Sequence, residues 1–369
     1  MPQFIPGVRL NEMFYREAVA PILASAFPGL RYSAALIGYG SDVLGFDSEH
    51  STDHEWGPRL VIFLSEKDRD VLVPSIDETL ATGLPHEFYG YSTNFSEPDE
   101  DRVRILEPVK SDRIRHHVYF HTFPEFIRDY LGIALGQEIT NIDWLLMYQN
   151  ALLEITGGAV YHDGLGELIP LREKLTWYPR DVWLFMLASQ WIRLAQEEPF
   201  PSRCGENGDE VGSRIVTARM VRDVMRLCFL IERRYAPYSK WLGTAFSRLV
   251  CARELEPILR AALSEDSWQG REEHLCAAYL FVARMNNDLG LFRKLKAETR
   301  YFHRRPYRVL WAGRFAKAVS DEIKNEQLRN IYDIAGPIGS IDQFGDSTNL
   351  LMRSDLRTRL RVLYEAPAL

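Results

Sequence analysis

The pattern of apolar and polar positions divides the chain into a first part that mixes helices with strands and a second part that is helical. Apolar residues recur at helical spacing over 9–27, and short apolar runs at 32–38 and 60–64 are typical of buried strands. A helical pattern follows at 66–82, whereas 83–100 is rich in Gly, Pro, Ser and Asn and predicts a loop. These elements predict a mixed sheet with flanking helices near the N-terminus.

Further elements are predicted beyond residue 100. Alternating residues at 102–107 and 116–121 favour two more strands. Pro124 suits the first turn of a helix, and another helix is expected over 142–156. A Gly157-Gly158 break and a turn-rich stretch then close this part of the chain.

From 171 to about 335, nearly every segment has a helical pattern, and the tail after 347 is predicted to be one more helix. Turn-rich breaks interrupt this region at 199–213, 236–239, 264–270, 286–290 and 336–346. The predicted fold class is α+β (α/β), with a mixed-sheet domain at 1–165 and an all-helical domain at 166–369.

Net charge and segment lengths exclude several classes of function. The net charge is −7 and the isoelectric point is about 5.8, so no extended nucleic-acid partner is expected, although a local basic cluster could bind a phosphorylated ligand. No apolar run approaches the roughly 20 residues of a membrane helix. Arg9, Glu12, Arg16 and Glu17 interrupt the position of a signal-peptide core, so we expect a cytoplasmic protein without membrane contact.

The strongest candidate for chemistry lies between the first two predicted strands. Gly40 and Ser41 form a turn after the first strand, with Ser41 expected to cap a short helix over 42–46. Asp53 and Glu55 stand before the second strand, and alternate residues of an extended chain point the same way. Two convergent carboxylates beside free backbone N–H groups suit Mg²⁺ or Mn²⁺ and a polyphosphate.

A glycine-serine turn followed by an Asp-x-Glu pair resembles the nucleotidyltransferase superfamily. Longer patches resemble an uncharacterised bacterial family with a domain of unknown function that is described as nucleotidyltransferase-like. These patches are GYGSDVLGFDSEHSTDHEWGPR, YPRDVWLFMLASQWIRLAQEEPF, RCGENGDEVGSR and RDVMRLCFLIERRYAPYSKW.

The resemblance implies a nucleotidyltransferase-like domain and a site in a cleft beside the helical domain. Gly40 and Ser41 would hold phosphates, and Asp53 and Glu55 would hold the metal and act in catalysis. The substrate would be a nucleoside triphosphate, expected to be ATP. Its nucleotidyl group would pass to a hydroxyl of a small-molecule or protein acceptor.

Two departures from the superfamily pattern leave a second interpretation open. Trp56-Gly57-Pro58 separates the acidic pair from the strand, which places the pair on a bend. The later strand at 116–121, where a third carboxylate is usual, offers His117, Tyr119 and His121 instead. The alternative is therefore a catalytically degenerate nucleotide sensor or an interaction scaffold.

The helical part contains a second candidate cluster. Arg219, Arg222 and Arg226 are three and four residues apart and share one helical face. Such a face is commonly solvated or ion-paired; alternatively, it is a clamp for a triphosphate. Ser239-Lys240 resembles the serine-lysine pair with which several nucleotidyltransferases hold the triphosphate, so Arg219, Arg222, Ser239 and Lys240 are candidate nucleotide contacts.

Two further patterns have weaker functional interpretations. The histidines at 50, 54, 117 and 121 invite a zinc interpretation together with Asp53 and Glu55, but no compact ligand spacing is present. The acidic loop at 205–210 is either an exposed helix–helix connection or a contact for a cationic acceptor that also supplies the missing acid.

Overall fold

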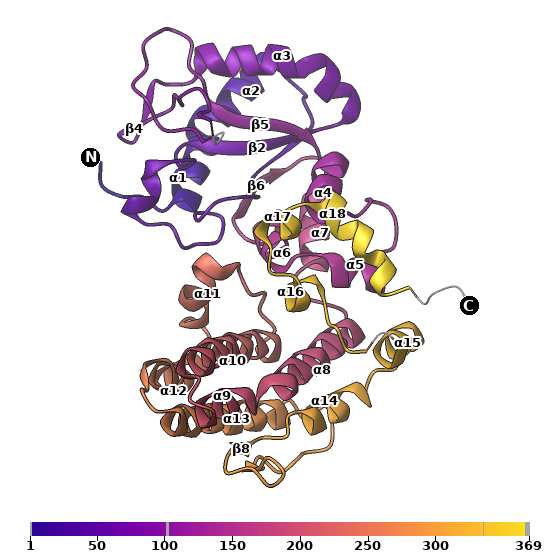
Figure 1. Cartoon of the computed structure of the whole chain (residues 1–369). Coiled ribbons are helices and arrows are strands. Elements are labelled where there is room, and N and C mark those ends of the chain that lie inside the picture. Colours follow the sequence, from indigo (N-terminus) through magenta and orange to yellow (C-terminus); the bar gives the residue numbers. More distant parts are fainter. Residues whose placement is uncertain (1, 101–102, 335, 366–369) are drawn as a thin grey trace. The chain divides into compact units, whose positions relative to one another are not determined.

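The computed structural model describes residues 2–100, 103–334 and 336–365 and has an α+β fold (Figure 1). The chain forms two compact units. The first comprises residues 1–137 and 151–176, and the second comprises 138–150 and 177–369. Among the described residues, no helix combines the length and the apolar character needed to cross a bilayer.

A four-stranded mixed sheet forms the centre of the first unit. Its strands, in the spatial order β5-β2-β1-β6, are β5 (His117–Thr122), β2 (Arg59–Leu64), β1 (Tyr32–Leu36) and β6 (Ala159–Asp163). The central strand β1 runs antiparallel to both of its neighbours, and β2 runs parallel to β5. The strands expected at 32–38, 60–64 and 116–121 are thus confirmed.

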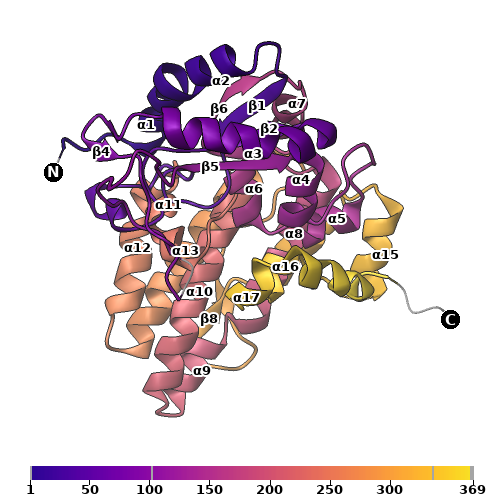
Figure 2. The same cartoon turned by 90° about the horizontal axis from the view of Figure 1, so that it is seen from above.

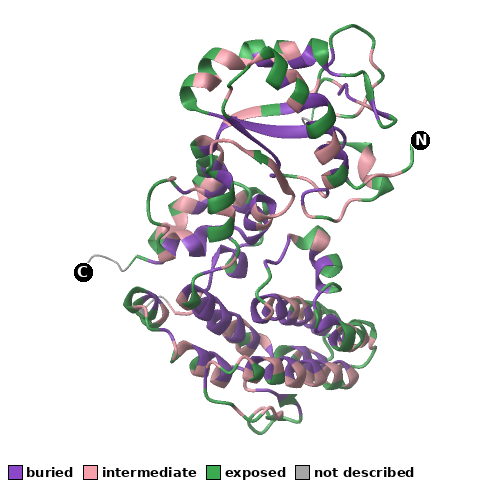
Figure 3. Ribbon diagram, turned by 180° about the vertical axis from the view of Figure 1, so that it is seen from behind, coloured by how far each residue is buried: buried purple, intermediate pink, exposed green. Residues whose placement is uncertain are grey.

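Helices cover both faces of this sheet. Alternate residues of β1 and β2 pack with α1 (Gly7–Phe14), the π-helical turn η1 (Tyr15–Val19), α2 (Ala20–Ala26) and α3 (Glu66–Gly83) in one apolar core. Helix α3 lies across β2 and β5 (Figure 2). On the other face, Phe63 contacts Phe123 and Phe126 of α4 (Phe123–Leu131) edge to face. Both β1 and β2 are therefore buried along their whole length (Figure 3).

Three of the elements predicted before residue 165 are wrong. Residues 42–46 form a turn instead of a short helix. At 102–107 the described residues make one isolated bridge, Phe95 to Leu106, in place of a strand, and residue 102 lies outside the described residues. The helix expected at 142–156 is divided into α5 (Asn141–Leu146) and α6 (Gln149–Thr156).

The sequence also missed short elements that depend on a partner strand. Strand β6 follows the glycine pair and pairs with β1 through a bulge between Ala34 and Ala35. The loop at 83–100 contains the two-residue strands β3 (Glu87–Phe88) and β4 (Tyr91–Ser92). Short strands have little intrinsic pattern, so their pairing depends on the rest of the fold.

The second unit consists mainly of helices packed around α8 (Arg180–Glu197) and α10 (Glu210–Ile231), whose buried surfaces are shown in Figure 3. The other long helices are α12 (Ala252–Ser264) and α13 (Trp268–Asp288). Shorter helices are α11 (Ser239–Phe246), α14 (Gly313–Ser320), α15 (Glu326–Ile334), α16 (Ile341–Phe344), α17 (Thr348–Leu351), α18 (Ser354–Arg357) and η3 (Thr358–Leu363). The helical character expected for this region is confirmed.

Long-range polar contacts attach 138–150 to the second unit. The Gln149 backbone N–H donates to the Asp342 carboxylate, and the Gln149 side-chain oxygen accepts from the Ala236 N–H at 2.8 Å. The Arg357 guanidinium donates to the Leu146 carbonyl at 3.1 Å. The sequence composition predicts one domain boundary at 165. In the structure, the chain passes from one compact unit to the other three times, at residues 138, 151 and 177.

Three expectations for the helical region need correction. The predicted break at 199–213 contains the helix α9 (Phe200–Glu206). The segment between α13 and α14 is largely irregular and carries the hairpin β7 (Arg300–Tyr301) and β8 (Arg308–Val309). The tail after 347 consists of several short helical turns instead of one helix.

Candidate functional site

A buried ion pair holds the glycine-serine turn against the start of β2. The Arg59 guanidinium donates to both Asp42 carboxylate oxygens, at 2.6 and 3.1 Å, and to the Tyr39 carbonyl at 2.9 Å. Arg59 is 7% exposed and Asp42 is 1% exposed. The Asn11 side-chain oxygen accepts from the Arg59 backbone N–H at 2.6 Å. Because charged groups are buried only when paired, this ion pair determines the path of the turn.

Glycine at position 40 is required by this ion pair. Gly40 has a φ of +145°, and a Cβ there would come within 2.3 Å of Arg59 and 2.2 Å of Asp42. Asp42 is thus drawn inward, which is why residues 42–46 do not begin a helix. Within the described residues, the half-buried Ser41 makes no side-chain hydrogen bond.

The two candidate carboxylates stand on a bend and not on an extended strand. Asp53 is the last residue of the 3₁₀ turn η2 (Glu49–Asp53), and Glu55 has a left-handed φ of +49°. The expectation that both project from one face of a strand is therefore wrong, because β2 begins only at Arg59. Both side chains remain accessible, with exposures of 66% for Asp53 and 41% for Glu55.

Each carboxylate has its own neighbours. The Asp53 carboxylate lies 2.9 Å from Nδ1 of His54. One oxygen of Glu55 accepts from the Arg104 backbone N–H at 2.8 Å, and the Glu55 N–H donates to the Arg104 carbonyl at the same distance. The other oxygen of Glu55 is 3.4 Å from Nε2 of His117. Glu55 is thereby held in one position, whereas the neighbour of Asp53, His54, is itself half-exposed.

Strand pairing brings the turn and the acidic pair to one end of the sheet. The turn follows the last residue of β1, and the acidic pair precedes the first residue of β2, which runs antiparallel to β1. His117, the first residue of β5, pairs with Arg59 in the parallel register. The glycine-serine turn, the acidic pair and the start of β5 thus share this end, and we call them the sheet-end site.

His117 is a neutral positioning residue at the sheet-end site. Burial, with the charges of Arg59 and Arg104 close by, lowers the pKa of His117 to about 3. Its Nδ1 is buried without a hydrogen bond among the described residues. A proton there would be an unpaired buried donor, so hydrogen-bond accounting assigns the proton to Nε2. Nε2–H then faces the Glu55 carboxylate and the Tyr119 hydroxyl.

Acidification is expected to destabilise the first unit through His117. The pKa is about 3 in the folded protein and 6.5 ordinarily, so between these values the unfolded chain binds a proton that the folded chain excludes. The stabilisation is complete above pH 6.5 and is lost as the pH falls towards 3. At pH 5 the loss is about 2 kcal/mol.

Hydrogen exchange at residues 59–64 and 117–122, corrected for intrinsic rates, measures this loss at pH 7 and pH 5. The variant His117→Gln keeps a polar side chain but cannot titrate, so its protection should change less over the same interval. If wild type and variant lose protection equally between the two pH values, another group is responsible for the acid sensitivity.

In the described part of the chain, no third protein ligand accompanies the acidic pair. Within the described residues, no group of three or more His, Cys, Asp or Glu side chains is arranged to hold a metal ion. Of the acids near β5, Glu125 lies 3.2 Å from Arg69 and also accepts from the Thr122 hydroxyl, and Glu107 lies 3.4 Å from Arg115. The zinc interpretation of the nearby histidines therefore has no ligand cluster to support it.

The candidate phosphate contacts of the second unit differ in their surroundings. Arg219 is paired with Glu197 at 2.6 Å and Arg222 with Asp346 at 3.3 Å. The ammonium of Lys240 lies 5.2 Å from the centre of the Trp241 ring. The two arginines thus belong to an ion-paired face, and both of their partners lie outside α10.

A polar cavity brings two of these candidates together. Arg222 and Ser239 line a cavity of about 50 Å³ in the second unit, together with Arg226 and Asp342. This volume is sufficient for bound water. Burial raises the pKa of Asp342 to about 6, although Arg226 close by favours its charged form.

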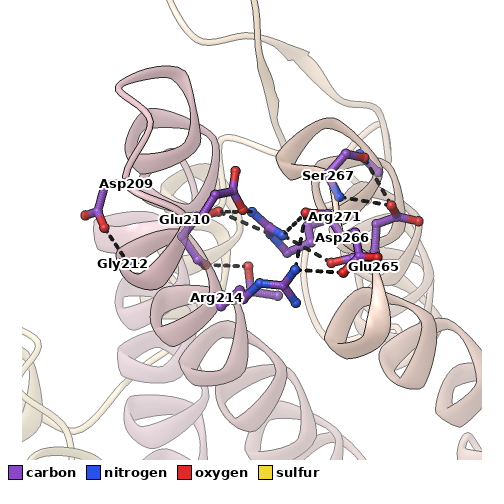
Figure 4. Close-up of polar contacts among 11 residues, drawn as sticks. Asp209, Glu210, Gly212, Arg214, Glu265, Asp266, Ser267 and Arg271 are labelled. Atoms are coloured by element: carbon purple, nitrogen blue, oxygen red, sulfur yellow. Dashed lines mark hydrogen bonds and ion pairs between the residues drawn. The ribbon is translucent and has the colours of Figure 1, made fainter.

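The acidic loop at 205–210 serves the packing of the helices (Figure 4). Asp209 caps α10 by accepting from the Gly212 N–H at 2.8 Å. Glu210 pairs with Arg271 at 2.5 Å; Arg271 is 1% exposed and also donates to the Asp266 carbonyl. These acids therefore have structural partners, as expected for a helix–helix connection.

Sequence reasoning missed Arg59, Arg104 and Asn11, although one signal was available. Arg59 opens an otherwise apolar strand, and a charged residue at a buried strand position requires a partner. No local signal identifies Arg104 or Asn11, because their contacts join segments that are 49 and 48 residues apart.

Residues 144–242 match a family model described as a domain of unknown function (DUF4037). The matched segment covers α6 to the beginning of α11 and excludes the sheet-end site. No curated protein matches the chain. The comparison therefore connects this chain to an uncharacterised domain and assigns no activity.

Proposed function

We propose that the sheet-end site binds a nucleoside triphosphate with a divalent cation and transfers the nucleotidyl group to a hydroxyl of a small-molecule or protein acceptor. One observation carries the proposal: two accessible carboxylates and an unbonded serine hydroxyl lie at the same end of two adjacent strands. The resemblance of the turn and acidic pair to nucleotidyltransferases supports it.

The donor set suits Mg²⁺ or Mn²⁺. These hard cations prefer oxygen ligands, and Mg²⁺ is commonly bound by one or two carboxylates, water and the phosphates of a substrate. Asp53 and Glu55 would supply the carboxylates, and neutral His117 orients Glu55 without adding a charge. When bound, the cation would neutralise charge that develops on the phosphates.

The remaining residues act on the nucleotide itself. The Ser41 hydroxyl would donate to a phosphate oxygen, and Gly40 keeps the turn free of a side chain. In the reaction, an acceptor oxygen forms a bond to the α-phosphorus while the bond to the leaving pyrophosphate breaks. The hydroxyl proton passes to a general base, and we assign this role to no residue of the site. Arg219, Arg222, Ser239 and Lys240 stay predicted phosphate contacts.

Calorimetric titration with ATP, GTP, CTP and UTP in the presence of Mg²⁺ tests the proposal. We expect Mg²⁺-dependent binding that weakens at least about tenfold in Asp53→Asn/Glu55→Gln, equivalent to ~1.4 kcal/mol, because both metal ligands lose their charge. The matched control is Asp70→Asn/Glu87→Gln, which removes two exposed acids elsewhere in the first unit. Equal binding by all three proteins would place the site elsewhere, and no binding would reject the proposal.

A nucleotide sensor without catalysis is the second candidate. It is favoured by the missing third ligand at the acidic pair within the described part of the chain. Mass spectrometry of acceptors incubated with the protein, ATP and Mg²⁺ separates the two. A product that retains the α-phosphate, with release of pyrophosphate, supports the transferase, whereas tight binding without either product supports the sensor.

A further inference from the structure

A strongly basic segment lies in the second unit between α13 and α14, and we call residues 293–308 the basic loop. It contains seven Lys or Arg residues and one Glu, a net charge of +6, whereas the whole chain carries −7. The basic loop is therefore locally positive although the net charge of the whole chain is negative. Such a field attracts anions within about a Debye length, roughly 8–10 Å at physiological salt.

The cations of the basic loop are displayed to solvent. All seven are exposed: Arg293, Lys294, Lys296, Arg300, Arg304, Arg305 and Arg308. Tyr301, in the middle of the loop, is 62% exposed, which is unusual for a large aromatic side chain. The loop thus presents positive charge and an aromatic ring together.

Ion pairs among the described residues involve three of these seven cations. Glu298 pairs with Lys296 at 2.5 Å and also with Arg300, and Arg305 is 3.9 Å from Glu206. Within the described ranges of the chain, Arg293, Lys294 and Arg304 form no ion pair. Three cations are therefore available to an external anion without breaking an existing pair.

Contacts beneath the basic loop hold it in place. The Asn287 side chain exchanges two hydrogen bonds with the Leu295 backbone, at 2.7 and 3.0 Å. The Arg314 guanidinium donates to the carbonyls of Lys296 and Glu298. Tyr307 is fully buried. A loop anchored in this way loses less conformational entropy on binding than a flexible one.

We propose that the basic loop binds single-stranded nucleic acid. Arg293, Lys294 and Arg304 would contact phosphates, and a base would stack on Tyr301, above which the Arg308 guanidinium lies 5.7 Å from the ring centre. Positive charge combined with an accessible aromatic ring is the arrangement that binds unpaired bases. An acidic peptide would use the charges but carries no base to stack on the ring. This proposal is independent of nucleotidyl transfer.

Fluorescence anisotropy with a labelled uridine 12-mer tests the proposal on the full chain. If Arg293, Lys294, Arg304 and about two of the other loop cations contact phosphates, a plot of log affinity against log salt should have a slope of about −3.5. Arg293→Gln/Lys294→Gln/Arg304→Gln should reduce the slope to about −1.4 and weaken binding about 100-fold at 0.1 M salt. The control Arg253→Gln/Arg260→Gln/Arg329→Gln removes three exposed charges elsewhere and should change affinity by less than about threefold.

Tyr301 separates this proposal from a general attraction to anions. Tyr301→Ala should weaken binding about tenfold with an unchanged salt slope, and Tyr301→Phe should retain wild-type affinity, because stacking requires only the ring. A duplex of the same length should bind less well because its bases are already stacked. The proposal is wrong if the uridine 12-mer does not bind, if the two triple variants behave alike, or if Tyr301→Ala binds as wild type does.

Discussion

Arg59→Met is expected to destabilise the first unit by about 3–5 kcal/mol. The substitution leaves the Asp42 carboxylate buried, at 1% exposure, without the guanidinium that donates to both of its oxygens. An uncompensated charge in the interior is one of the few causes of so large an effect. Loss of hydrogen-exchange protection in 32–36 and 59–64 measures it, with urea denaturation as a second readout.

The control for Arg59→Met is Arg128→Met, which removes an arginine that is 61% exposed and pairs with its exposed neighbour Asp129. Exposed pairs contribute about 0–1 kcal/mol, so this variant should behave almost as wild type. Asp42→Asn/Arg59→Met removes both charges and should recover about 2 kcal/mol of the loss. If Arg59→Met and Arg128→Met unfold alike, the buried pair does not stabilise the fold as argued.

The same substitution connects stability with the proposed function. The pair holds the glycine-serine turn through Asp42 and the Tyr39 carbonyl. We therefore expect Arg59→Met to weaken Mg²⁺-dependent nucleotide binding even at temperatures where the first unit stays folded. Asp42 and Arg59 are positioning residues in this scheme, because neither is proposed to touch the nucleotide.

Glu198→Ala is expected to destabilise the second unit by about 3–4 kcal/mol. Glu198 follows the end of α8 and is 7% exposed, and its carboxylate accepts the backbone N–H groups of 310–312 at 2.7, 3.1 and 2.9 Å. These groups precede α14, whose own N-cap residue, Ala312, has no side-chain acceptor. Removal of Glu198 leaves three donors without an acceptor at the positive end of a helix.

The adjacent residue supplies the matched control for Glu198→Ala. Glu197 pairs with Arg219 on the partly exposed face of α8, so Glu197→Ala should cost about 1 kcal/mol or less. Both variants are compared by hydrogen exchange at 180–197 and 313–320. Burial raises the pKa of Glu198 to about 7, so pH 8 keeps the side chain charged. A similar loss of protection in both variants would contradict the capping role.

Local sequence patterns were sufficient for the elements with a strong period. Runs of apolar residues located β1 and β2, alternation located β5, and helical spacing located α3, α8 and α10, because these patterns depend on residues close together in the chain. Turn chemistry likewise located the Gly40-Ser41 turn. Local sequence patterns could not predict the conformation of Asp53 and Glu55, because the contact of Glu55 with Arg104 joins residues 49 positions apart.

The missing features depend on tertiary contacts. Strand β6 exists because it pairs with β1 some 130 residues earlier, as the Ser33–Asp163 hydrogen bond shows. Residues 42–46 turn inward because Arg59 needs a buried partner, and residues 310–312 are held by a carboxylate 112–114 positions earlier in the chain. In each case a buried charge or an unpaired backbone group must be satisfied, and the cost of leaving it unsatisfied exceeds the weak local preference of the segment.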